Sequence, residues 1–374
     1  MKSSLRIGTL FGIPIQLHFT FLLVIPLFTW IIGSQIEFSI SFISSLFGGF
    51  DDAIIKNNPY IFGFLVTVGL FLGVLVHELA HSLIAKKKGI KIHNITLLIL
   101  GGVSSLEEGI PDPRVELPMA LAGPLTSLSV GILCWLGVIA IQAVSPPDHI
   151  TGAFVYTLGY LAVLNVMLFA FNLLPAFPMD GGRVLRAWLA KKMPLRKATK
   201  IAADVGKGFA ILFAVLGIIA FNPILIIIAF FIYIGAGQEF SVLRYQILLK
   251  DLTIGQVMNT PVVTVSPELP VPRLIELMYT TKHLGFPVVD RGQLIGIVAL
   301  ADVQKRSTID REALQVRDIM TREVLTLPPD ASLIEAFKLM SARQIGHIPV
   351  TAGGAILGIV TRTDILRVME LQEI

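Results

Sequence analysis

The sequence predicts a multi-pass α-helical membrane domain with six transmembrane helices, followed by a soluble α+β domain built from a duplicated unit. Mean hydropathy is +0.77, and 54% of the 374 residues are hydrophobic while only 15% are charged. This balance is typical of chains that cross a bilayer several times. The long apolar runs lie within residues 1–240, whereas residues 250–374 have the composition of a soluble domain and contain an internal repeat.

Six apolar stretches are interpreted as spans, since about 20 apolar residues cross a bilayer as a helix. They are about Pro14–Gly33, Ile61–Ile84, Leu117–Val144, Phe154–Leu174, Ile201–Phe221 and Ile224–Gly237. The intervening residues 34–60 and the basic stretch 183–200 are expected as loops. Lys and Arg gather on one side of this arrangement, which predicts a cell-membrane protein with both termini in the cytoplasm.

The stretch Lys91–Ser105 is too short to span the membrane. Its alternating pattern and its Gly101-Gly102 break predict two strands in a re-entrant hairpin. Irregular backbone at membrane depth must be covered by protein or line a wet cavity, so the hairpin is expected beside such a cavity.

The charge and cysteine content narrow the function classes. The formal net charge is only +4, concentrated near the ends of the spans, which favours a lipid setting and argues against nucleic acid as a partner. The single cysteine, Cys134, lies in an apolar run, so no disulfide framework is possible.

A metal-binding pattern interrupts the second span, where His77, Glu78 and His81 form an HExxH motif. On a helix, positions i and i+4 share a face, so both imidazoles can reach one metal ion. Glu78 is placed to take a proton from water at that metal, as in metalloproteases. Ionisable groups at this depth are costly and are functional by default, although a satisfied polar cluster in a helix bundle is the alternative.

A third metal ligand is expected because catalytic zinc generally has three protein ligands and an open position. Asp180 is the candidate, since Pro175 and Pro178 end the fourth span just before it and Gly181-Gly182 allows a sharp turn after it. Asn172 is expected to point its amide into the same cavity. The alternatives are a helix cap for Asp180 and an interhelical hydrogen bond for Asn172.

Together these motifs resemble the site-2 proteases, which are intramembrane zinc metalloproteases. The resemblance rests on His77-Glu78-Leu79-Ala80-His81 paired with Asn172…Pro175…Pro178-Met179-Asp180-Gly181-Gly182-Arg183. It implies Zn²⁺ as cofactor, with His77, His81 and Asp180 as ligands, Glu78 as general base and Asn172 as a substrate or oxyanion contact. It also implies a transmembrane protein substrate, a single-pass protein already trimmed outside the membrane, whose unwound segment meets a strand edge of the hairpin.

The C-terminal repeat has a spacing of 62 residues, which pairs Met258 with Met320 and Asp302 with Asp364. With the shared FPVVD/IPVTA and GIVALAD/GIVTRTD segments, it resembles a cystathionine-β-synthase-type (CBS) domain pair. Such pairs often bind adenine nucleotides, which implies ATP, ADP or AMP contacts at Thr361, Asp364 and Asp302. Ala299 replaces the corresponding hydroxyl residue in the first half, and a purely structural or dimerising module is the alternative.

These observations predict a protease domain at residues 1–245 and two CBS repeats at residues 251–308 and 313–374. The expected protein is a zinc-dependent intramembrane endopeptidase, with a cytosolic CBS pair that senses adenine nucleotides or joins two copies into a homodimer. The alternatives from other classes are a membrane transporter gated by its CBS pair and a non-catalytic membrane scaffold.

Overall fold

The computed structural model describes residues 4–98, 101–106, 110–146 and 148–372. The chain divides into two compact units, Met1–Leu243 and Arg244–Ile374, which are described in turn.

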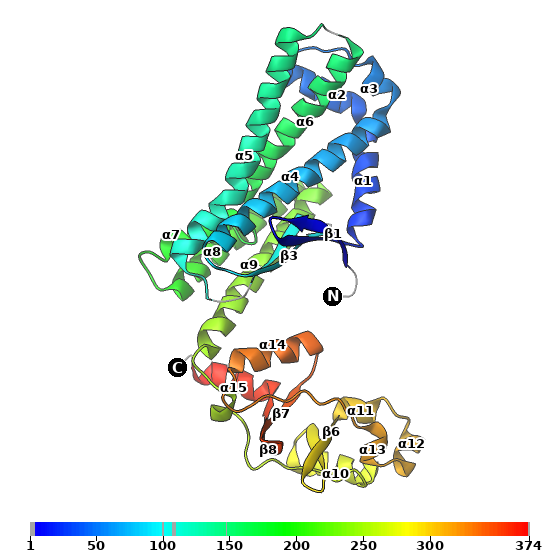
Figure 1. The fold of residues 1–374 in the computed structure, drawn as a ribbon, viewed down its shortest axis with the longest axis vertical. Helices are drawn as coiled ribbons and strands as arrows, with labels where there is room; N and C mark the ends of the chain where they lie inside the picture. The colour runs from blue at the N-terminus through cyan, green and yellow to red at the C-terminus, as the bar shows by residue number, and fades with distance from the viewer. Residues whose placement is uncertain (1–3, 99–100, 107–109, 147, 373–374) are drawn as a thin grey trace. The chain divides into compact units, whose positions relative to one another are not determined.

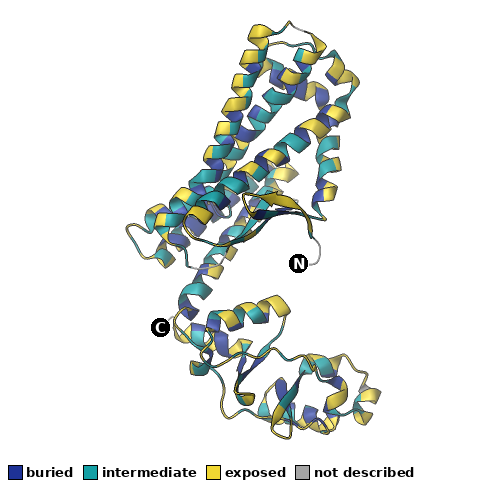
Figure 2. Cartoon of the chain, viewed as in Figure 1, coloured by how far each residue is buried: buried dark blue, intermediate teal, exposed yellow. Residues whose placement is uncertain are grey.

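The first unit is a helical membrane domain, as the sequence predicts. Within the described residues, five helices are long and apolar enough to cross a bilayer: α4 (Pro59–Lys87), α5 (Pro113–Val144), α6 (His149–Asn172), α8 (Leu195–Ile219) and α9 (Pro223–Leu249). Helices α4, α5 and α6 pack against one another as the centre of the unit (Figure 1). Large apolar side chains such as Leu133 and Phe154 are exposed on these helices. Figure 2 shows exposed positions along the helices of this unit, where lipid would cover them.

The first expected span is wrong as a single helix over Pro14–Gly33. Its first part is strand β2 (Ile13–His18), in which Ile13 and Ile15 are buried with a period of two. The helix α1 begins only at Phe21 and ends at Ser34, and α2 (Ile36–Phe47) follows it at an angle of 73°. The sixth expected span is present only if α1 and α2 are counted together as one bent span. The loop expected over residues 34–60 instead contains α2 and α3 (Ala53–Asn57).

A four-stranded sheet borders α4. Strand β1 (Ser4–Leu10) pairs with β2, β2 runs parallel to β3 (Ile92–Leu98), and β3 pairs antiparallel with β4 (Gly101–Leu106). The hairpin predicted for Lys91–Ser105 is therefore present as β3 and β4, while its turn at residues 99–100 lies outside the described residues. Within the described residues, strand β4 is at an edge of this sheet, and one row of its backbone groups has no strand partner there.

The expected basic loop over residues 183–200 is mostly helical. Helix α7 (Asp180–Leu189) occupies its first part, and α8 begins at Leu195. Arg186 and Ala187 of α7 are buried, so this basic segment packs against the protein rather than lying in solvent.

The second unit shows the duplication directly. Helix α10 (Val271–Thr281) and hairpin β5 (Gly285–Asp290)–β6 (Gln293–Ala299) recur as α14 (Leu333–Arg343) and hairpin β7 (His347–Ala352)–β8 (Ala355–Thr361). The remaining elements are η1 (Ile254–Gln256), α11 (Leu300–Gln304), α12 (Thr308–Ala313), α13 (Val316–Ile319) and α15 (Arg362–Leu371).

The two halves exchange their entry segments. Asn259, which precedes α10 in the first half, pairs with Ile359 of β8, and Thr321, which precedes α14 in the second half, pairs with Ile297 of β6. The core around Met340 correspondingly includes Ile254. The hairpin of each half is therefore extended by the N-terminal segment of the other half.

Candidate functional site

Helix α4 carries the two histidines on one face, as their i, i+4 spacing requires. The side chain of His77 is 5% exposed and that of His81 is 12% exposed. Neither ring lies on a solvated or lipid-facing surface, because both are covered by α5 and by the start of α7.

Asp180, the first residue of α7, meets the two imidazoles. Its Oδ2 atom lies 3.2 Å from Nε2 of His77 and 3.1 Å from Nε2 of His81, and the two Nε2 atoms are 3.1 Å apart. Among the described residues, these three form the one group of three or more His, Cys, Asp or Glu side chains that could hold a metal ion.

The hydrogen bonds at the far side of each ring favour metal binding. Nδ1 of His81 lies 2.6 Å from the carbonyl oxygen of Met119, which can only accept, so a neutral His81 presents a lone pair at Nε2. Nδ1 of His77 contacts the hydroxyl of Ser127 at 2.9 Å. Carbonyl and hydroxyl partners of this kind orient metal-binding histidines.

The spacing of the three facing atoms fits zinc. With bonds of about 2.1 Å, two ligands of a tetrahedral zinc lie about 3.4 Å apart, close to the separations seen here. Two nitrogen lone pairs and a carboxylate oxygen would repel one another at 3.1–3.2 Å without a cation or protons between them. The donor set of two histidines and one carboxylate is also one that catalytic zinc uses.

Gly123 of α5 leaves open space beside the two imidazoles. A Cβ atom at this position would come within 2.2 Å of Nε2 of His81 and 2.6 Å of Nε2 of His77. The space left by this glycine therefore faces Nε2 of both histidines.

Glu78 is turned toward strand β4 by hydrogen bonding. The hydroxyl of Ser104 donates to Oε2 of Glu78 at 2.9 Å, and Ser82 lies 3.1 Å from the same hydroxyl. Gly102 passes so close that its Cβ would lie 2.3 Å from Cγ of Glu78. The hairpin therefore orients the carboxylate, a role that its short alternating sequence did not indicate.

The loop before Asp180 explains the two glycines after it. Neither Gly181 nor Gly182 has a positive φ, so the sharp turn expected from them is not their role. A Cβ on Gly181 would lie 2.2 Å from the carbonyl oxygen of Leu174, and one on Gly182 would lie 2.6 Å from the backbone nitrogen of Phe177. The glycines let the first turn of α7 pack directly on the preceding loop, which fixes Asp180.

Asn172 is the last residue of α6, and its Nδ2 donates to the carbonyl oxygen of Leu168, one turn earlier in the same helix. A second amide, Asn165, was not singled out from the sequence. It is 2% exposed, its Oδ1 has no hydrogen-bond partner in the described part of the chain, and it packs on Gly73, one turn before His77. A polar amide within an otherwise apolar span was the sequence signal available for it.

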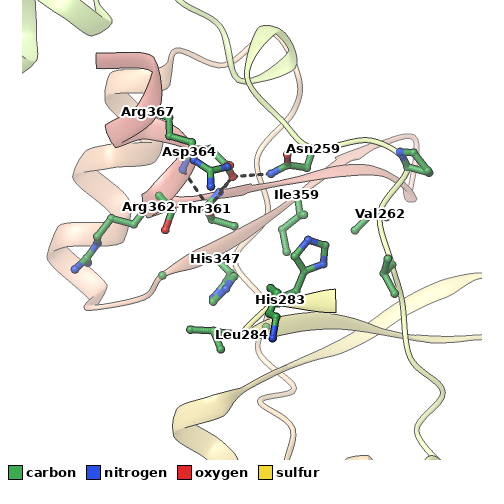
Figure 3. A pocket seen from close by; sticks show the side chains of 16 residues that line it. Asn259, Val262, His283, Leu284, His347, Ile359, Thr361, Arg362, Asp364 and Arg367 are labelled. Carbon is green, nitrogen blue, oxygen red and sulfur yellow. Dashed lines mark hydrogen bonds between the residues drawn. The ribbon is translucent and has the colours of Figure 1, made fainter. Parts of the chain in front are cut away.

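The second unit contains a cavity of about 310 Å³ between its two halves. Thr361 and Asp364 line it, as Figure 3 shows, and Asp364 accepts from the Thr361 hydroxyl at 2.6 Å and from Asn259 at 2.7 Å. Lys282 and Arg367 add positive charge to the lining.

Asp302 does not reach this cavity. Its carboxylate accepts from the backbone nitrogen of Ala299 and from Lys305, at the equivalent place in the first half. The sequence assigned Thr361 and Asp364 to the second half and Asp302 to the corresponding place in the first half, where Ala299 replaces the hydroxyl residue.

Comparison with known proteins places these features in context. The model of peptidase family M50 matches residues 65–158 and 136–215, and the CBS domain model matches residues 254–308 and 316–371. Zinc metalloprotease MJ0392 of Methanocaldococcus jannaschii is 36% identical over 375 residues, which cover all of this chain and 98% of that protein. Rip3 of Mycobacterium tuberculosis is 28% identical over 99% of this chain and 94% of its own length. The solved site-2 protease from Methanocaldococcus jannaschii has 40% identity over 63% of this chain and 94% of that one, with a TM-score of 0.43.

Proposed function

Because the chain belongs to peptidase family M50, the intramembrane zinc metalloproteases of the site-2 type, we propose that it cleaves transmembrane segments at the His77, His81 and Asp180 cluster. The observation that carries this proposal is the convergence of three ligand atoms from α4 and α7 within 4.8 Å of one another. The three side chains are assigned as the zinc ligands and Glu78 as the general base.

Zinc held there would polarise the scissile carbonyl and make the attacking water a better nucleophile. Glu78 accepts the proton of that water and later delivers it to the leaving nitrogen. Ser104 holds the Glu78 carboxylate in the orientation that this transfer needs. Asn172, at the end of α6, is assigned to the substrate or to the developing oxyanion, which requires its amide to leave the carbonyl of Leu168.

The substrate is a membrane protein whose helix unwinds locally, since a helix hides its peptide bonds. The open edge of β4, which carries Ser104, can pair with such an extended segment. A single-pass protein already trimmed outside the membrane is the proposed substrate, and both termini are proposed to lie in the cytoplasm.

The test uses the purified protein in detergent, with zinc content and cleavage of a transmembrane substrate measured side by side. Glu78→Gln is expected to keep its zinc and lose cleavage, and Asp180→Ala is expected to lose zinc. The transporter alternative instead predicts ion flux that survives Glu78→Gln. Zinc binding by the wild type without cleavage of any transmembrane substrate would favour the scaffold, and absence of zinc binding would contradict the ligand assignment.

A second proposed function is adenine-nucleotide sensing by the CBS pair. The cavity at Thr361 favours it, because Asp364 can accept from a ribose hydroxyl while Lys282 and Arg367 can face phosphate. In Figure 3 the side chain of Arg362 extends away from Asp364, and its Nη2 donates to the carbonyl oxygen of Met340. We assign nucleotide contact to Thr361 and Asp364 and give Asp302 no part in this cavity.

Calorimetry with ATP, ADP and AMP tests this second function. Binding by the wild type is expected to weaken in Thr361→Val and to persist in Asp302→Asn. Equal cleavage rates with and without saturating nucleotide would remove a regulatory role. Light scattering of the same samples measures whether the pair also forms the proposed homodimer.

A further inference from the structure

The membrane unit buries a positive charge that the proposed reaction does not use. Arg186 is 4% exposed and lies in the last turn of α7, the helix that begins with Asp180. Taking a guanidinium out of water is costly unless excellent geometry compensates for it. The burial of an arginine on the helix that supplies a proposed metal ligand therefore needs a structural or functional explanation.

Every side of this guanidinium is engaged. Its Nε donates to the two carboxylate oxygens of Glu116 at 2.9 and 3.2 Å, and its Nη2 donates to the same carboxylate. Its Nη1 donates to Glu239 of α9 at 3.4 Å, and its Cζ lies 4.9 Å from the ring centre of Phe177. Arg186 thus joins α7 to α5, to α9 and to the loop that precedes Asp180.

The partner Glu116 is 3% exposed and lies on the face of α5 that supports both histidines. Met119, Gly123 and Ser127 follow it at three, seven and eleven residues, which is the spacing of one helical face. Met119 and Ser127 orient His81 and His77, and Gly123 packs on the two ligand nitrogens. One face of α5 therefore fixes the two imidazoles at one end and holds α7 through Glu116 at the other.

We propose that Glu116 and Arg186 are positioning residues that set the place of Asp180 relative to His77 and His81, and thereby the metal affinity of the site. The inference rests on the proposed ligand set. A bidentate pair is directional, so it fixes the register of α7 against α5. An apolar pair of similar volume fills the same space without fixing that register.

The experiment uses full-length protein in detergent, stripped of metal. The zinc dissociation constant is measured by competition with a chromophoric chelator, and the unfolding midpoint is measured without metal. The variants are Arg186→Met, Arg186→Lys and the double variant Glu116→Leu/Arg186→Met. Visible absorption of the cobalt-substituted proteins reports whether Asp180 still coordinates the metal.

A matched control separates positioning from stability. Tyr156→Phe removes a buried hydrogen bond between Tyr156 and Ser39, 2.8 Å long, in a different core cluster of the same unit. It lowers stability without touching α5 or α7. Asp180→Ala shows the affinity that remains when the third ligand is lost.

Each single change of Arg186 is expected to weaken zinc binding 10- to 100-fold, as loss of a group that orients a ligand does. The double variant is expected to regain the wild-type unfolding midpoint, because an apolar pair can replace a buried ion pair without loss of stability. Its zinc affinity should stay reduced, and its cobalt spectrum should approach that of Asp180→Ala. Tyr156→Phe should keep wild-type affinity.

Recovery of both stability and affinity in the double variant would overturn the inference, as would an equal loss of affinity in Tyr156→Phe. Wild-type affinity in both Arg186→Lys and the double variant, together with a loss in Asp180→Ala, would reject the positioning role and leave the ligand set intact. Wild-type affinity in Asp180→Ala would refute the ligand set and this inference together.

Discussion

Replacement of Gly123 by alanine is the smallest change that tests the metal site. The added Cβ would lie 2.2 Å from Nε2 of His81 and 2.6 Å from Nε2 of His77. Non-bonded heavy atoms come to rest at about 3.5 Å, so the rings or α5 must move by roughly 1 Å. The overlap falls on the two atoms assigned to zinc rather than on a flexible side-chain end.

This displacement sets the expected magnitudes. Metal–ligand distances tolerate about 0.2 Å, and a misplacement of about 1 Å costs about 100-fold in rate. Overpacking of a core costs about 1–3 kcal/mol of stability. Gly123→Ala should therefore lose at least about 100-fold in both zinc affinity and cleavage while remaining folded.

The assay compares zinc binding and cleavage in Gly123→Ala with those in Gly137→Ala, a change in the same helix. A Cβ at Gly137 would meet only Cδ1 of Leu158, at 3.3 Å, which is a side-chain end that can move. Gly137→Ala should match the wild type in zinc affinity and cleavage. Its stability should be unchanged or higher by up to about 1 kcal/mol, since alanine is the better helix former. Wild-type zinc affinity in a folded Gly123→Ala protein would refute the assignment of the two facing nitrogens as ligands.

Three further changes test other parts of the structure. Ser104→Ala removes the hydrogen bond to Glu78 and should lower kcat about 10- to 100-fold with unchanged zinc content, because a bond to a charged group is worth about 1.5–3 kcal/mol; equal kcat would contradict the orienting role. Gly181→Ala should lower stability by about 1–3 kcal/mol in thermal unfolding, since its Cβ would lie 2.2 Å from the carbonyl oxygen of Leu174. Burial lowers the pKa of the His347 imidazole from 6.5, so the unfolded chain binds a proton at this residue more readily than the folded one. The second unit should therefore lose stability as the pH falls below 6.5. His347→Gln should flatten that dependence in thermal unfolding followed from pH 8 to about 5, and an unchanged slope would show that another group is responsible.

Local sequence determined the histidine pair and the duplicated unit. Residues four apart in an apolar helix share a face whatever surrounds them, so His77 and His81 could be placed together without a structure. The 62-residue repeat likewise appears as two matching helix–hairpin units, because both halves repeat the same local pattern. Hydropathy identified five spans, since long apolar helices need no further information.

Hydropathy failed over residues 14–60, where period-two burial, strand pairing and a helix bend divide the apolar run. The strand pairing joins segments that are distant in sequence, since β2 pairs with β3. Hydropathy averages over a window and cannot register such pairing.

Tertiary structure alone decided how the site is held. Asp180 is 103 residues from His77, and Arg186 is 70 residues from Glu116, so neither contact has a local signature. Glu116 and Ser127 could be recognised as polar residues in a span-forming helix, but not as partners of Arg186 and His77. Contacts of this kind follow from which helix faces pack together, and that is a property of the whole fold because each face is chosen by all of its neighbours at once.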